Sequence, residues 1–254
     1  MIFMAIYVVS DIHGYYKLFL KGLSEICFSE NDFLWCLGDA IDKGPDGIRV
    51  LQHIMTADNM DLIIGNHEYM MINAVSASGE SGYNNVDMAL WLDGNNGGST
   101  YSAFEQLSIE EQTSILEWLK QRYVIKTLEV NGRRFCLSHS FYAPKCENKR
   151  FCELKAGDVW NVTWSSIWRD DYLTGAMDIY NRYKYTFIIG HVPVQLVRRW
   201  HEGMDEWNIL TGYRHHNMIN IDGGCAIGKS KEYQNGIIIL KLDDMTEHAV
   251  QLSD

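Results

Sequence analysis

Short runs of apolar, β-forming residues recur along this chain, and each run stops at a cluster of Asp, His, Asn and Gly. The first three runs end before Ser10-Asp11-Ile12-His13-Gly14, Gly38-Asp39-Ala40-Ile41-Asp42-Lys43-Gly44 and Gly65-Asn66-His67-Glu68. Three later runs end before His139, Gly190-His191 and Asp222-Gly223-Gly224. Apolar runs bounded in this way are typical of buried strands. The pattern therefore predicts strands whose C-terminal ends collect polar side chains.

Segments with helical periodicity separate the first three of these strands. One apolar face joins Leu18, Phe19, Leu23 and Ile26, and a second joins Ile48, Leu51, Ile54 and Met55. Pro45 and Asp46 are residues that favour the start of the second helix. The first third of the chain therefore predicts the order β-α-β-α-β. In open α/β sheets, ligands bind at the C-terminal edge of the strands, where the polar clusters lie.

The middle of the chain, about residues 69–123, is predicted to be mainly helical. Ser108-Ile109-Glu110-Glu111 has the form of a capping box at the start of a helix. The stretch from Gly79 to Gly98, rich in Gly and Asn, predicts a loop near the site that interrupts this region. No stretch rich in Pro, Ser or charge marks a domain boundary. We expect one domain over residues 1–254, with a helical insertion at about 69–123.

Composition and charge narrow the classes of function. Of the 254 residues, 46% are hydrophobic and 22% charged, and the net charge is −11, which excludes a disordered chain. An acidic chain without a basic run disfavours nucleic acid and anionic membranes as partners. The apolar opening is too short to span a bilayer and lacks the basic start of a signal peptide. The six cysteines form no C-x-x-C pair, which favours free thiols and a cytoplasmic location.

The predicted strand ends supply carboxylate, amide and imidazole groups that together suit a metal site. Such ligands favour a divalent ion such as Mn²⁺, Fe²⁺ or Zn²⁺. The candidate ligands outnumber what one tetrahedral ion needs, so a carboxylate that bridges two ions, about 3.5–4 Å apart, would account for the set. The candidates are Asp11, His13, Asp39, Asn66, His139 and His191.

The same segments, in this order, resemble the calcineurin-like metallophosphoesterases, and more closely their bacterial phosphoprotein phosphatase (serine/threonine) branch. Gly190-His191-Val192-Pro193-Val194 and Ile221-Asp222-Gly223-Gly224-Cys225 resemble two further segments of that branch. The resemblance runs from Asp11 to Cys225 and covers most of the chain. It implies an α/β fold, a four-layer αββα sandwich with two metal ions among the loops at one sheet edge.

The resemblance also implies roles for individual residues. Asp11, His13 and His191 would hold one metal, Asn66 and His139 the other, and Asp39 would bridge them. His67 would be the general acid, oriented by Asp42, and Lys43, Arg169 and Asn66 would bind the substrate phosphate. Manganese is the expected metal, with iron or zinc as alternatives. Glu68 is expected to support the site from behind.

Three positions depart from the branch's pattern. Lys43 stands where arginine is usual, Ser140 where glycine is usual after the histidine, and Arg169 is displaced by one position. Lysine keeps the positive charge but loses the bidentate geometry of arginine. Most of the eight tryptophans are assigned to the hydrophobic core.

The function that the resemblance implies is hydrolysis of phosphoserine and phosphothreonine in proteins by a hydroxide that two metal ions activate. The first alternative is symmetrical hydrolysis of diadenosine tetraphosphate by a related branch, in which the carboxylate at the position of Asp42 is typically replaced. The second is a degenerate phosphatase that binds phosphopeptides without turnover. The sequence leaves the physiological substrate and the oligomeric state open.

Overall fold

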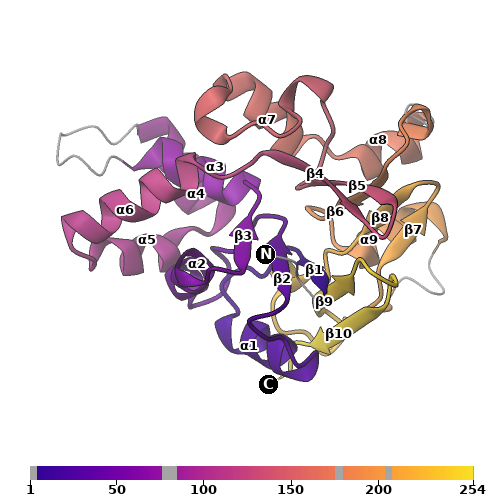
Figure 1. The fold of residues 1–254 in the computed structure, drawn as a ribbon. Helices are drawn as coiled ribbons and strands as arrows, with labels where there is room; N and C mark the ends of the chain where they lie inside the picture. Colours follow the sequence, from indigo (N-terminus) through magenta and orange to yellow (C-terminus); the bar gives the residue numbers. More distant parts are fainter. Residues whose placement is uncertain (1–4, 76–84, 175–179, 204–207, 254) are drawn as a thin grey trace.

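The computed structural model describes residues 5–75, 85–174, 180–203 and 208–253, and these build two five-stranded sheets (Figure 1). The first sheet has the order β10-β9-β1-β2-β3. Its strands are β1 (Ile6–Val9), β2 (Phe33–Cys36), β3 (Met60–Leu62), β9 (Gly236–Lys241) and β10 (Glu247–Gln251). Strands β1, β2 and β3 are parallel, β9 is antiparallel to β1, and β10 is antiparallel to β9. The three predicted N-terminal strands therefore end at one edge.

The second sheet repeats this arrangement with strands from the later half of the chain. Its order is β4-β5-β6-β8-β7, and β5, β6 and β8 are parallel. Its strands are β4 (Ile125–Val130), β5 (Arg133–Ser138), β6 (Thr186–Ile189), β7 (Tyr213–His215) and β8 (Met218–Asn220). The predicted polar clusters that begin at His139, Gly190 and Asp222 follow its three parallel strands.

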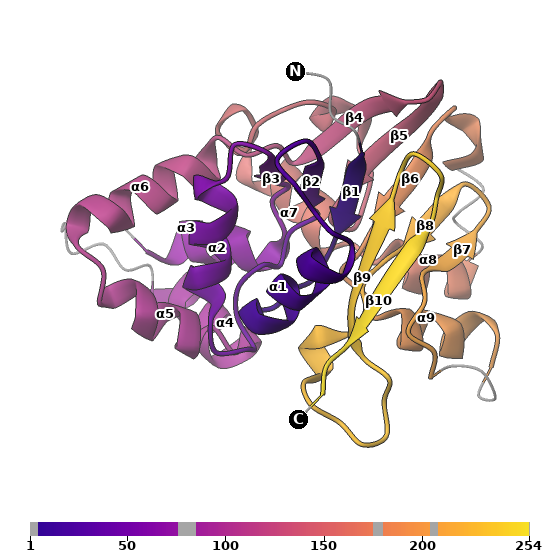
Figure 2. The same ribbon diagram turned by 60° about the horizontal axis from the view of Figure 1, so that its bottom comes forward.

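Helices cover the outer faces of the two sheets, which explains why the central strands are apolar on both faces. Helices α1 (Tyr16–Glu25) and α2 (Gly47–Thr56) lie on the first sheet. In α1, a Cβ on Gly22 would lie 2.8 Å from the Ile237 side chain of β9, so glycine allows this close approach. Helices α8 (Ile167–Thr174) and α9 (Val194–His201) lie along the second sheet (Figure 2), and α7 (Ala156–Trp164) packs against α3 (Asn66–Ala74). The prediction of a four-layer αββα sandwich is confirmed.

Between β3 and β4 the described residues form four helices, in the stretch where the sequence predicts a mainly helical insertion. They are α3 (Asn66–Ala74), α4 (Asn85–Asn95), α5 (Gly98–Glu105) and α6 (Ile109–Lys120), together called the helical segment below. The capping box at Ser108 is present: Ser108 Oγ accepts from Glu111 N at 3.2 Å, and Glu111 Oε2 accepts from Ser108 N at 2.9 Å.

The predicted loop from Gly79 to Gly98 is wrong over most of its length. Residues 79–84 lie outside the described part of the chain, but Asn85–Asn95 form α4. Gly and Asn disfavour a helix when it stands alone, whereas α4 is packed between α3 and α5 and buries Trp91 completely. Tertiary packing therefore outweighs the local preference.

Short 3₁₀ helices at Pro144–Cys146, Phe151–Glu153 and Cys225–Ile227 complete the described elements. Within the described residues, no helix has the length and apolar character needed to cross a bilayer. The cysteines at all six positions are free thiols, as predicted.

Candidate functional site

The loops that follow the parallel strands of both sheets meet at one place and are joined by backbone hydrogen bonds. Asp11 N donates to the Gly38 carbonyl at 3.1 Å, which links the loops after β1 and β2. The His139 ring Nδ1 donates to the Leu37 carbonyl at 2.8 Å, and Gly190 N donates to the His139 carbonyl at 2.8 Å. The bond between the His139 ring and Leu37 ties the strand ends of the second sheet to those of the first.

Several non-glycine residues of these loops have a left-handed backbone. This conformation is uncommon for residues with a Cβ and is often found at functional sites. It turns the side chains at the ends of the strands inward, toward one another. The residues are Asp11 (φ 52°), His13 (φ 49°), Asp39 (φ 53°), Asp42 (φ 68°), Lys43 (φ 63°) and His191 (φ 70°).

One group of candidate metal ligands consists of Asp11, His13 and Asp39. His13 Nδ1 donates to the Ile41 carbonyl at 3.1 Å, which leaves Nε2 to face the carboxylates. Nε2 lies 3.8 Å from Asp39 Oδ2 and 3.9 Å from Asp11 Oδ1. Asp11 Oδ2 accepts hydrogen bonds from Ser10 Oγ and from His191 N, whereas Asp11 Oδ1 is buried without a described hydrogen-bond partner.

A second group consists of Asn66, His139 and His191, and it also reaches Asp39. His139 Nε2 lies 2.9 Å from Asn66 Oδ1, 3.1 Å from His191 Nδ1 and 3.5 Å from Asp39 Oδ2. His191 Nδ1 lies 3.1 Å from Asn66 Oδ1. The Asp39 carboxylate therefore stands between the two groups, as a bridging ligand would.

The expected partition of His191 is corrected by this geometry. The sequence analysis placed His191 with Asp11 and His13, but its ring nitrogen lies with Asn66 and His139. Among the described contacts, His191 reaches Asp11 through its backbone N–H, which donates to Asp11 Oδ2 at 3.0 Å. A sequence motif identifies the residue but not the direction of its ring, which depends on the loop after β6.

The two groups fit divalent cations. Burial raises the pKa of Asp11 and Asp39 well above the usual range of a carboxyl group. Burial also lowers the pKa of His13 and His139, and lowers that of His191 to about 4, so these imidazoles are neutral at pH 7. Buried carboxylates need a compensating cation. The unpartnered Asp11 Oδ1 and a donor set of oxygen and imidazole nitrogen match that need.

His67 and Asp42 form a hydrogen-bonded pair beside these groups. His67 Nδ1 lies 2.6 Å from Asp42 Oδ2, and His67 Nε2 lies 3.8 Å from Asp39 Oδ2. Burial raises the pKa of Asp42 to about 7 and lowers that of His67 to about 3. The hydrogen bond from Nδ1 to Asp42 directs Nε2 of the imidazole toward the candidate metal ligands.

Glu68 supports the loops from behind, as predicted. Its carboxylate accepts hydrogen bonds from the backbone N–H groups of Asp39 (2.8 Å), Ala40 (2.8 Å) and Gly65 (3.0 Å). Three backbone donors satisfy a carboxylate that is fully buried. Glu68 therefore holds the loop after β2 against the start of α3.

Sequence analysis missed two residues that contact Asp42. Trp91 Nε1 donates to Asp42 Oδ2 at 2.7 Å, and Asp42 N donates to Thr100 Oγ1 at 2.9 Å. Both residues belong to the helical segment, and Trp91 was assigned to the core with most of the tryptophans. Its indole is buried as expected, but it also donates a hydrogen bond to Asp42, which the sequence around Trp91 does not indicate.

The predicted phosphate-binding residues are placed differently. Lys43 is half-buried beside the Asp42–His67 pair, and its charge lowers the pKa of both groups. Arg169 lies in α8 with an exposed side chain, and its described hydrogen bond runs from its backbone N to Ser166 Oγ. The start of α8 is close to the site, because Ser140 Oγ donates to the Ser165 carbonyl at 2.6 Å. The structure does not bring the Arg169 side chain into contact with either group of described residues.

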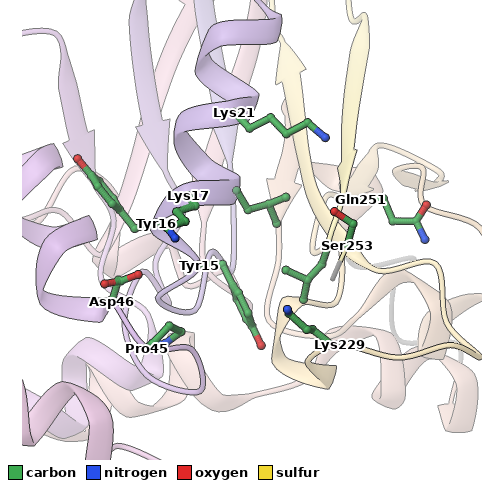
Figure 3. Close-up of a pocket in the computed structure, with 11 residues that line it drawn as sticks. Tyr15, Tyr16, Lys17, Lys21, Pro45, Asp46, Lys229, Gln251 and Ser253 are labelled. Carbon is green, nitrogen blue, oxygen red and sulfur yellow. The ribbon is translucent and has the colours of Figure 1, made fainter.

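A pocket of about 440 Å³ lies at the same edge of the first sheet (Figure 3). The loops that carry His13 and Lys43 continue directly into its wall at Tyr15 and Pro45. Three lysines face it with one aspartate, so it is electropositive in an acidic chain. We call it the lysine-lined pocket; its lining includes Tyr15, Tyr16, Lys17, Lys21, Pro45, Asp46, Lys229, Gln251 and Ser253.

Comparison with known proteins gives relatives with two kinds of activity. The chain is 31% identical to serine/threonine-protein phosphatase 2 of Salmonella typhimurium, over 74% of this chain and 80% of that protein. It is also 31% identical to the symmetrical bis(5'-nucleosyl)-tetraphosphatase of Buchnera aphidicola subsp. Schizaphis graminum, over 56% of this chain. That match spans about half of the tetraphosphatase, 46% of its length.

Solved structures with the same fold include a metallophosphoesterase from Sphaerobacter thermophilus (TM-score 0.55, 16% identity, 98% of this chain and 90% of that one). A cold-active protein-tyrosine phosphatase of a Shewanella species has a TM-score of 0.52 at 19% identity, over 98% of this chain and 81% of that one. Residues 4–219 match the family described as calcineurin-like phosphoesterase. The match covers most of the chain and includes every candidate ligand, so the chain belongs to the calcineurin-like phosphoesterase family.

Proposed function

We propose that this chain is a metal-dependent phosphomonoesterase of the serine/threonine protein phosphatase type, formed as one domain with a helical insertion at about residues 69–123. The observation that carries the proposal is the Asp42–His67 hydrogen bond of 2.6 Å beside the Asp39 carboxylate. The alkoxide that leaves a phosphoserine is a strong base, and its departure is accelerated by a proton donor. An imidazole oriented by a carboxylate is suited to that task.

We propose that two divalent cations, Mn²⁺ first among them, bind in the two groups of ligands. Asp11 and His13 would hold one cation, Asn66, His139 and His191 the other, and Asp39 would bind both. When bound, such cations supply positive charge for the phosphoryl oxygens and acidify a water molecule for attack. The donor set, without a thiolate, favours manganese, iron or zinc.

In this proposal the remaining site residues bind the phosphate and deliver the proton. Lys43 and Asn66 face the phosphoryl oxygens, and Arg169 joins them through the mobility of a long exposed side chain. His67 Nε2 donates a proton to the leaving oxygen, and Asp42 keeps the imidazole oriented and stabilises its positive charge. No step requires a covalent bond between enzyme and phosphorus.

The Asp42 carboxylate also supports the protein phosphatase over the dinucleotide hydrolase, because the resemblance implies that the latter branch typically replaces this carboxylate. The relative from Salmonella, named a serine/threonine-protein phosphatase, aligns over 80% of its length. The substrate we propose is therefore a phosphoprotein or phosphopeptide. The free thiols at all six cysteines suit the reducing cytoplasm that we propose as its location.

Symmetrical hydrolysis of diadenosine tetraphosphate is a second candidate, favoured by the lysine-lined pocket. A dinucleotide with four phosphates carries more negative charge than one phosphoserine, and Lys17, Lys21 and Lys229 surround a pocket of about 440 Å³ at the same sheet edge. Four relatives of this kind match the chain at 28–31% identity, each over about half its own length. The pocket gives the second candidate a specific test.

The test is hydrolysis by metal-stripped protein, with and without added Mn²⁺, of a phosphoserine peptide and of diadenosine tetraphosphate. We expect Mn²⁺ to restore turnover of the peptide. Turnover of the dinucleotide alone, with a loss of affinity in Lys229→Ala, would establish the second candidate. Binding of metal and phosphopeptide without turnover of either substrate would establish a non-catalytic binding protein.

A further inference from the structure

The helical segment contacts the loop Asp42–Gly44 at every residue. Trp91 Nε1 donates to Asp42 Oδ2 at 2.7 Å, and Lys43 N donates to the Asn96 carbonyl at 3.3 Å. Ser99 Oγ donates to the Gly44 carbonyl at 2.8 Å. Together with the bond from Asp42 N to Thr100, these contacts come from ten consecutive residues of α4, α5 and the turn between them. A peripheral part of the fold thus holds the loop that carries the Asp42 carboxylate.

Trp91 is the member of this set that touches the carboxylate itself. Its side chain is fully buried, and its ring packs edge-on against Tyr101 with the centroids 6.0 Å apart. A Cβ on Gly97 would lie 2.5 Å from the indole Nε1, so the indole rests directly against the backbone at Gly97. The indole is therefore confined from two sides, and its N–H points at Asp42.

The two oxygens of the Asp42 carboxylate are used unequally. Oδ2 binds both the His67 imidazole (2.6 Å) and the Trp91 indole (2.7 Å), whereas Oδ1 is buried without a described partner. A partial rotation about the Cβ–Cγ bond would move Oδ2 away from His67. The Asp42 backbone bond to Thr100 does not oppose this rotation, but a second donor on Oδ2 does.

We propose that Trp91 is a positioning residue for proton transfer, which holds Asp42 Oδ2 in line with His67 so that His67 Nε2 faces the leaving oxygen. This inference rests on the proposed function, because it assumes that His67 is the proton donor. It assigns a role in the reaction to the helical segment. The Trp91 indole contacts Asp42 and Tyr101, so its effect on the reaction would pass through Asp42.

The dependence of the rate on the leaving group separates this role from a structural one. A phosphoserine peptide releases a basic alkoxide that needs a proton, whereas 2,4-dinitrophenyl phosphate releases a stable phenolate that does not. We expect Trp91→Phe to lower kcat for the peptide about tenfold, a fraction of the 10²–10⁴-fold typical of general acid catalysis. With 2,4-dinitrophenyl phosphate, the change in kcat is expected to be less than about twofold, and KM for both substrates is expected to stay the same.

Trp168→Phe is the matched control, since Trp168 is also buried (1% exposed) and its indole nitrogen has no described hydrogen-bond partner. It removes the same ring volume, and we expect the ratio of the two kcat values to equal that of the wild type. An equal fall of both kcat values in Trp91→Phe, or no fall in either, would overturn the proposal.

Two further measurements keep the test decisive if Trp91→Phe folds poorly. Gly97→Ala retains the indole but displaces it, and we expect the same selective loss on the peptide. In the background of Asp42→Asn, Gly97→Ala should cause no additional selective loss, because the effect of the displaced indole passes through Asp42. An additional loss as large as in the wild-type background would contradict this.

Failure of the proposed function is recognised separately. If the wild type with Mn²⁺ hydrolyses neither substrate, the proposed function is wrong. If His67→Asn lowers kcat equally for both substrates, the assignment of His67 as proton donor is wrong. If His67→Asn shows the selective loss and Trp91→Phe does not, only the role of Trp91 is wrong.

Discussion

The Asp39 carboxylate separates two parts of the site that are built in different ways. On one side, candidate metal ligands follow strands β1, β3, β5 and β6, and hydrogen bonds of His139 to Leu37 and of His191 to Asp11 join the loops of the two sheets. On the other side, the Asp42–His67 pair is held by Trp91 and Thr100 of the helical segment. The candidate metal ligands thus lie at the ends of strands, with Asn66 at the start of α3, whereas the Asp42 carboxylate beside the proton donor is held by α4 and α5, outside both sheets.

The largest effect is expected from Asp39→Asn, because Asp39 belongs to both sides. Its Oδ2 lies 3.8 Å from His13 Nε2, 3.5 Å from His139 Nε2 and 3.8 Å from His67 Nε2. Loss of a bridging charge should remove metal and lower kcat by a factor of about 10³ or more. Elemental analysis and kinetics of the purified variant check this; a variant that keeps two equivalents of metal would show that Asp39 is no bridge.

His67→Asn should affect proton donation but not metal binding. The substitution removes the proton donor, so we expect kcat for a phosphoserine peptide to fall about 10²-fold. The hydrogen bonds of His139 and His191 that join the two sheets do not involve the His67 ring, so the metal content should equal that of the wild type. Loss of metal in this variant would mean that the two sides are not independent.

Metal binding should become tighter as the pH rises from about 5 to 8. Burial raises the pKa of Asp11 and Asp39, so the metal-free protein holds protons there that a cation must displace. His191, with its pKa lowered to about 4, is already neutral over this range and adds no dependence. Each displaced proton contributes about 1.4 kcal/mol per pH unit to the stabilisation by metal.

The increase in Tm on adding Mn²⁺, measured across that range, tests the prediction. An increase that grows with pH agrees with carboxylates that lose protons on metal binding. An increase that shrinks with pH would mean that the metal does not compete with protons at Asp11 and Asp39. His67→Asn, which leaves both carboxylates intact, is the matched control and should show the same trend.

The smallest effect is expected from Lys43→Arg. Lys43 already supplies a positive charge beside the Asp42–His67 pair, so arginine adds only the bidentate geometry that suits a phosphate. We expect KM for the peptide to fall by about twofold to threefold with little change in kcat. A change in metal content would mean instead that Lys43 influences metal binding.

The same division marks what the sequence can predict. The strand ends were predictable because a buried parallel strand is a short apolar run, and a polar residue directly after it must lie at the C-terminal edge of the sheet. Asp11, Asp39 and His139 were therefore placed together correctly, although they lie in different sheets. The ring direction of His191 was not predictable, because it depends on the contact of its backbone with Asp11 across the two sheets.

The helical segment shows the opposite case. Helix α4 carries Gly94 and two terminal asparagines, Asn85 and Asn95, and it packs against helices on more than one side. A helix covered in this way shows no simple apolar stripe, so both the composition and the periodicity favour a loop. Trp91 was missed for the same reason. Its partner, Asp42, lies 49 residues away, and only the tertiary fold brings the two together.

The bond between His191 N and Asp11 Oδ2 joins residues 180 positions apart, and it has a consequence for how the protein reaches its active form. During synthesis, the loops after β1, β2 and β3 emerge long before β5 and β6, so the four candidate ligands of the early loops must wait for His139 and His191. Contacts so distant in sequence are slow to form. Acquisition of metal therefore reports on late assembly of the two sheets, and in a refolding experiment it should follow the gain of helical structure.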